Sequence, residues 1–168
     1  LQVTMGMREP SSYDRLVIER EFQPGTTKIG LTAVGRSLRL GGRVYARGIG
    51  VNSPSVLRVT TTQPVVAFSA DIGLDRNADG TDGSVRMYVK AGGRTLFSTG
   101  VITADGRVYP CRVDLGGVTE FTLEVDDGGD TVNCDQADWC DAQITYADGA
   151  TAWLDDLARV SAWDARLP

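Results

Sequence analysis

The sequence is dominated by short segments in which apolar and polar side chains alternate, separated by glycine-rich stretches. A period of two turns one face of a β-strand toward a core and the other toward water. The clearest case is 84–90, where Val85, Met87 and Val89 share a face. With 20 glycines in 168 residues, such segments predict an all-β, two-sheet antiparallel β-sandwich. The expected strands are 16–21, 29–31, 56–60, 65–72, 84–90, 95–98, 109–115, 120–125 and 142–146.

The directions of these strands predict where a functional site would lie. If neighbouring strands run antiparallel, the loops 48–55, 73–83 and 126–139 fall at the same end of the sandwich. They are also the loops richest in Asp, Asn and Gln. Because rigid strands position functional loops in this way, we expect a binding site at this three-loop end.

Composition excludes several classes of function. The net charge is −5 and Lys is almost absent, so we expect neither a nucleic-acid partner nor membrane insertion. Histidine is absent, which removes the commonest general base and zinc ligand. Of the three cysteines, Cys134 and Cys140 flank one loop; they could pair in an oxidising compartment, or they could stay reduced together with Cys111.

Five motifs, in order, resemble the NPCBM family, also called carbohydrate-binding module family 51. Residues 35–55 resemble its opening segment. Residues 68–75 (FSADIGLD) resemble its F-x-A-x-V-G-x-D strand, and 83–89 (GSVRMYV) its G-S-V-x-F-x-V strand. Residues 123–130 and 135–139 (DQADW) resemble its closing D-x-G-D and D-H-A-D-W segment. The resemblance covers about residues 30–146.

This resemblance implies a jelly-roll, galactose-binding-like β-sandwich that is appended to glycoside hydrolases. It implies a secreted, non-catalytic module that recognises terminal galactose or N-acetylgalactosamine-type glycans and targets a covalently linked glycoside hydrolase domain. Two positions depart from the family: Asn52 and Gln136 stand where the family has His. Amides still offer hydrogen-bond donors and acceptors to sugar hydroxyls, but they do not titrate near neutral pH.

A sugar site needs planar polar groups for the hydroxyls and an aromatic face for the ring. Structural roles compete for several candidates: Trp139 could belong to the core, Asp135 could cap its turn, and Asn52 could hold its own loop. The candidate carbohydrate-binding residues are Asn52, Asp130, Asp135, Gln136 and Trp139.

The 73–83 loop contains D-x-N-x-D-G, the first half of a calcium loop, although Arg86 stands where a bidentate Glu is needed. Some members of the family that the chain resembles carry a structural calcium. We therefore expect a structural Ca²⁺ here, with a solvated acidic loop as the alternative. The candidate metal ligands are Asp75, Asn77, Asp79 and Asp82.

The expected organisation is an N-terminal extension (1–11), the carbohydrate-binding sandwich (12–147) and a linker or short helix toward a neighbouring domain (148–168). The Asp residues sit in turn contexts, so we predict that the chain is not an enzyme. The alternative function is a structural module that binds no glycan and packs against a catalytic domain. It predicts an exposed apolar patch from Trp153, Leu157 and Trp163.

Overall fold

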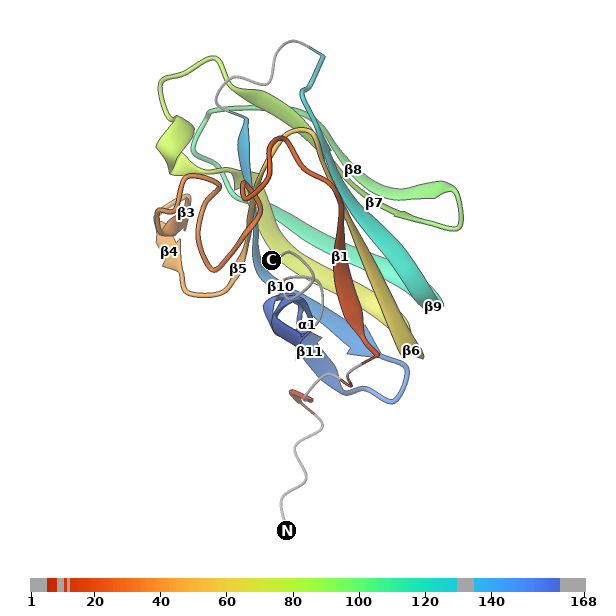
Figure 1. The fold of residues 1–168 in the computed structure, drawn as a ribbon. Coiled ribbons are helices and arrows are strands. Elements are labelled where there is room, and N and C mark those ends of the chain that lie inside the picture. The colour runs from red at the N-terminus through yellow and green to blue at the C-terminus, as the bar shows by residue number, and fades with distance from the viewer. Residues whose placement is uncertain (1–5, 9–10, 12, 130–134, 161–168) are drawn as a thin grey trace.

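The computed structural model describes residues 6–8, 11, 13–129 and 135–160, and nearly all of its elements are strands (Figure 1). The strands are β1 (Arg15–Arg20), β2 (Lys28–Ile29), β3 (Leu38–Leu40), β4 (Arg43–Tyr45), β5 (Gly48–Asn52), β6 (Ser55–Leu74), β7 (Ser84–Ala91), β8 (Arg94–Thr103), β9 (Tyr109–Asp126), β10 (Gln136–Tyr146) and β11 (Thr151–Trp153). A 3₁₀ turn, η1 (Arg76–Ala78), and one helix, α1 (Leu154–Val160), complete the described elements.

The 20-residue strand β6 defines the architecture because it folds back on itself. Fully extended it would span roughly 65 Å. Yet both of its ends lie beside the start of β10: Asn52, just before β6, pairs with Gln136, and Leu74 pairs with Ala137. The register with β9 shifts between Thr60 and Val65, where the β6–β9 ribbon bends.

Strand β9 bends at the matching point, where Gly116 and Gly117 have φ of 66° and 91°. Side chains rarely adopt such angles, so glycine permits the bend. The two halves of the ribbon form two sheets packed face to face (Figure 1). The first sheet contains β1, residues 55–60 of β6, residues 120–126 of β9, β7 and β8. The second contains β2, β5, β10, β11, residues 65–74 of β6 and residues 109–115 of β9.

The predicted β-sandwich is therefore confirmed, and its core lies between the two sheets. Phe68 packs against Phe121 and Trp139, with ring centroids 5.7 and 6.1 Å apart. The predicted strands 56–60 and 65–72 are one bent strand rather than two, as are 109–115 and 120–125. The two strands pair again beyond the bend, which alternation alone does not reveal.

A short hairpin of β3 and β4 packs on the outer face of the second sheet. Leu38, Leu40 and Tyr45 form a second, smaller apolar cluster with Cys140 of β10. Cys140 and Cys111 are free, buried thiols, so Cys140 closes no disulfide here; Cys134 lies outside the described residues.

The segment 48–52, expected as part of a loop, is strand β5. Its glycines reflect close packing: a Cβ on Gly50 would lie 2.2 Å from the Leu31 carbonyl oxygen and 2.6 Å from Thr32 Cα. Gly50 is therefore needed for the chain at 31–32 to lie against the strand.

The C-terminal segment contains the expected short helix, preceded by a strand that pairs with β10. Leu154, Leu157 and Ala158 are fully buried in the main core. Up to Ala158, this segment packs as part of the sandwich. Among the described residues, no helix is long and apolar enough to cross a membrane.

Candidate functional site

The three predicted loops meet at one end of the sandwich, and Asp135 joins them. Its Oδ2 accepts a hydrogen bond from Ser53 Oγ (3.1 Å), and its Oδ1 accepts one from the Ser84 N–H (3.0 Å). The Ser53 N–H also donates to the Asp135 carbonyl at 3.0 Å. Asp135 is fully buried, and hydrogen bonds to a buried carboxylate are among the stronger ones. Asp135 thus positions the loops rather than facing a ligand.

Asn52 and Gln136 are directly opposite each other on β5 and β10. Asn52 Nδ2 donates to the Ser53 carbonyl (2.9 Å), and its side chain is almost buried. Gln136 Oε1 accepts a hydrogen bond from Asn77 Nδ2 at 2.6 Å. The Gln136 amide therefore connects two of the loops, whereas the Asn52 amide holds the turn of its own loop.

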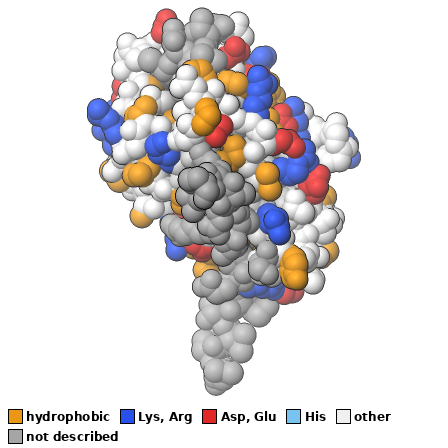
Figure 2. Space-filling view, viewed as in Figure 1, with side chains coloured by type: hydrophobic (Ala, Val, Ile, Leu, Met, Phe, Trp, Pro, Cys, Tyr) orange, Lys and Arg blue, Asp and Glu red, His pale blue; other side chains and the backbone are white. Residues whose placement is uncertain are grey.

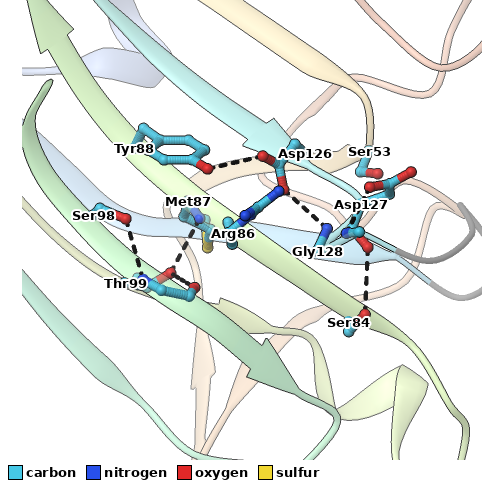
Figure 3. A network of polar contacts seen from close by, with 12 residues as sticks. Ser53, Ser84, Arg86, Met87, Tyr88, Ser98, Thr99, Asp126, Asp127 and Gly128 are labelled. Carbon is cyan, nitrogen blue, oxygen red and sulfur yellow. Dashed lines mark hydrogen bonds and ion pairs between the residues drawn. The ribbon is translucent and has the colours of Figure 1, made fainter.

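A polar network at the end of β9 fixes the next part of the site (Figure 3). Asp126 Oδ1 accepts from Arg86 Nε (3.0 Å) and the Gly128 N–H (2.9 Å), and Oδ2 accepts from the Tyr88 hydroxyl (2.9 Å). Partial burial alone would raise the pKa of Asp126, but these donors hold it below its usual range. Asp126 is therefore a charged carboxylate of fixed orientation.

Beside this network lies a surface hollow of about 400 Å³. Phe22 forms part of its wall with 37% of its surface exposed, and Arg20, Asp126 and Asp127 bring hydrogen-bonding groups. Asp127 and Ser53, both labelled in Figure 3, also line it. An aromatic ring beside fixed carboxylates is the chemistry that a sugar ring requires. The lining residues are Arg20, Phe22, Ser53, Pro54, Asp126 and Asp127.

The aromatic residue of this hollow differs from the predicted one. Trp139 is fully buried between the sheets and packs on Phe68, so it offers no face to a ligand. The sequence did not predict Phe22 as a site residue, because it follows β1 in a segment without a motif. Only the folded structure places it at the hollow. Asp130, another predicted residue, lies outside the described residues.

Three of the four predicted metal ligands have other partners in this structure. Asp75 caps η1 through the Asn77 N–H (2.8 Å) and also accepts from the Arg39 N–H (2.8 Å). Asp79 pairs with Arg76 at 2.6 Å, the Asn77 amide contacts Gln136, and Asp82 is exposed. Within the described ranges, no three acidic, thiol or imidazole side chains converge on one point.

Similarity to solved structures defines the class of protein. The chain resembles the family 51 carbohydrate-binding module of the Clostridium perfringens family 95 glycoside hydrolase, solved with methyl-galactose: TM-score 0.68, 23% identity, covering 77% of this chain and 92% of that one. It also resembles the second such module of Clostridium perfringens ZmpB, solved with N-acetylglucosamine: TM-score 0.68, 25% identity, covering 76% of this chain and 29% of that one. The fold is that of a carbohydrate-binding module, a non-catalytic accessory domain.

Residues 7–145 match the NPCBM/NEW2 domain family, and the chain belongs to this family. Alpha-1,3-galactosidase B of Akkermansia muciniphila is 31% identical over 142 residues, which are 82% of this chain and 17% of the galactosidase. The chain thus corresponds to a small part of that relative.

Proposed function

We propose that the chain recognises terminal galactose or N-acetylgalactosamine-type glycans at the three-loop end, and that it holds a covalently linked glycoside hydrolase domain near its substrate. The observation that carries the proposal is the hollow beside Phe22, Asp126 and Asp127. It combines an exposed aromatic ring with a carboxylate fixed by three donors. We infer an extracytoplasmic location, where such glycans are found.

Two relatives support this choice of ligand and partner. The family 95 relative was solved with methyl-galactose. The Akkermansia relative is a galactosidase, and the region that matches this chain is 17% of its length. On the face shown in Figure 2, basic and acidic side chains are interspersed, which suits a neutral ligand better than a polyanion.

Asn52 and Gln136 contribute to this proposal as positioning residues. Asn52 holds the Ser53 turn at the edge of the hollow, and Gln136 joins the start of β10 to Asn77. We propose that the amides that replace the family's histidines preserve the shape of the loop end without a group that titrates near neutral pH.

The structural alternative expected an exposed apolar patch from three residues, and the two that the structure describes, Trp153 and Leu157, do not form one. Leu157 is fully buried in the chain's own core. Trp153 is half-buried, with the Arg47 guanidinium 4.9 Å from its ring centroid, and Trp163 lies outside the described residues. These two residues therefore give no support to a docking role for this segment.

The test is a glycan-array screen of the chain and its Asp127→Ala variant, in calcium and in chelator. We expect binding to terminal galactose-type glycans, strongly reduced by Asp127→Ala because a carboxylate of the hollow is lost. Asp105→Ala is the matched control, since this exposed carboxylate neither lines the hollow nor belongs to the candidate metal ligands. A folded chain that binds no glycan would favour the structural alternative.

A further inference from the structure

A second hollow, of about 280 Å³, lies on the outer face of the second sheet. Its walls come from five strands: β4, β6, β9, β10 and β11. It shares no lining residue with the hollow at the three-loop end. The side chains that carry the argument are Arg43, Asp71, Arg112, Asp141, Gln143 and Trp153.

Asp141 occupies this hollow from an unusual backbone position. Its φ is 48°, and among the described residues it is the one non-glycine residue with a positive φ. It lies at a β-bulge, because Cys140 pairs with Asp71 and Gln143 with Ser69, which leaves two residues of β10 opposite one of β6. Bulges of this kind redirect a side chain, and a strained conformation is a recognised indication of a functional position.

The charged side chains around the hollow lie near one another at distances longer than those of hydrogen-bonded ion pairs. Arg43 lies 3.7 Å from Asp141 and 3.9 Å from Asp71, and Arg112 lies 3.8 Å from Asp71. All three distances exceed that of a charge-assisted hydrogen bond, about 2.8 Å. Hydroxyl groups placed among these side chains could therefore accept from the guanidinium groups and donate to the carboxylates.

The first sheet shows the opposite arrangement on its outer face. There Arg58 meets Glu120 at 2.6 Å, and Lys90 meets Glu124 at 3.1 Å. These pairs satisfy one another and leave little for a ligand. The open arrangement is thus a property of the second hollow and not of the charged surface in general.

One wall of the second hollow is a half-buried tryptophan held in place. Trp153 lies directly opposite Gln143 in the β10–β11 ladder, and the Arg47 guanidinium packs over its ring. On the other side, Tyr45 donates a hydrogen bond to Asp71 at 2.9 Å, which orients that carboxylate. The hollow is therefore formed before any ligand arrives.

We propose that this hollow is a second carbohydrate-binding site that takes a single neutral sugar ring. The two arginines and two aspartates balance in charge, which disfavours anions and cations alike. The volume is at the low end for a small-molecule pocket, which suits one ring. Because the ligand class is taken from the proposed function, the inference rests on it, while the location rests on the geometry above. Two sites on one module would add avidity.

The test is an NMR titration of the ¹⁵N-labelled chain with methyl-galactose and, separately, N-acetylglucosamine. We expect saturable shifts at the amides of Asp141, Gln143 and Trp153, independent of those at Ser53 and Asp127. Asp141→Gly removes the carboxylate where glycine suits the positive φ, so the variant should fold and lose about tenfold in affinity at this hollow alone. Asp105→Gly is the matched surface control, because this exposed carboxylate lines neither hollow.

The outcomes separate the two proposals. Shifts at both places, or at the second hollow alone, with the loss in Asp141→Gly, support the second site. Shifts at the three-loop end alone overturn it and leave the proposed function intact. No saturable shift with either sugar overturns both, and unchanged affinity in a folded Asp141→Gly overturns the role of the Asp141 carboxylate in the second hollow.

Discussion

At the scale of single residues, several positions in the family-like motifs turn out to have structural roles. Asp135 joins three loops, and Trp139 fills the core. The motif identifies these residues in the sequence. It does not tell whether each side chain points into the core or toward solvent. Phe22 carried no pattern at all, so only the folded chain brings it to the hollow.

Gly50 permits the tightest backbone approach at β5. We predict that Gly50→Ala destabilises the protein by about 3 kcal/mol, because its Cβ would overlap backbone atoms of residues 31 and 32, which would have to shift. Gly42→Ala is the control: no atom lies within 4 Å of its added Cβ. Urea denaturation measures both, and equal stabilities would contradict the packing account.

Asp138 makes stability depend on pH. Its carboxyl is fully buried, and burial together with the adjoining Asp75 carboxylate raises its pKa well above the usual range. The folded protein thus holds this proton more tightly than the unfolded chain does, in which the pKa of an Asp side chain is about 3.9. The contribution of Asp138 to stability is therefore full below about pH 4 and is lost progressively as the pH rises above that value.

We predict that Asp138→Asn, which cannot titrate, gains stability relative to the wild type as the pH rises from 4 to 8. The Asn amide is of nearly the same size as the carboxyl and carries N–H donors, so it suits the position beside the Asp75 carboxylate. Urea midpoints at several pH values give the comparison. Parallel pH profiles for the two proteins would show that Asp138 does not carry the proton in the folded state.

At the scale of elements, alternation located nine strand segments, yet it could not show how they join. The bend of the β6–β9 ribbon depends on pairing between segments far apart in sequence, with Gly116 and Gly117 opposite the register shift. The β3–β4 hairpin and β11 were missed because three-residue strands are too short to show a period.

The C-terminal helix is the element whose role differs most from a linker. We predict that Leu157→Ala lowers the free energy of unfolding by about 3 kcal/mol, as expected for a cavity at a fully buried leucine. Val44→Ala, at a side chain 65% exposed, should change it by less than about 0.5 kcal/mol. A Leu157→Ala protein as stable as the control would place the helix outside the cooperative fold.

At the scale of the whole molecule, the end of the sandwich that carries the site was predictable, because strand direction alone brings the three loops together. The residues of the hollow were predictable only in part. The loops contribute Ser53, Asp126 and Asp127, whereas Arg20 and Phe22 come from the end of β1 and the segment after it. A single sugar ring has roughly a dozen heavy atoms. At ~0.3 kcal/mol of binding free energy per heavy atom, we expect a dissociation constant of about 1 mM for one ring in the hollow.

The most direct test is a calorimetric titration of methyl-galactose into the Asp141→Gly variant, with and without Phe22→Ala. The Asp141→Gly background weakens the second hollow, so the heat reports the three-loop end. We predict a dissociation constant near about 1 mM, weakened about tenfold or more by Phe22→Ala and unchanged by Val101→Ala, an exposed apolar control on β8. Equal affinity with and without Phe22, or no binding by the folded protein, would contradict the proposed glycan site.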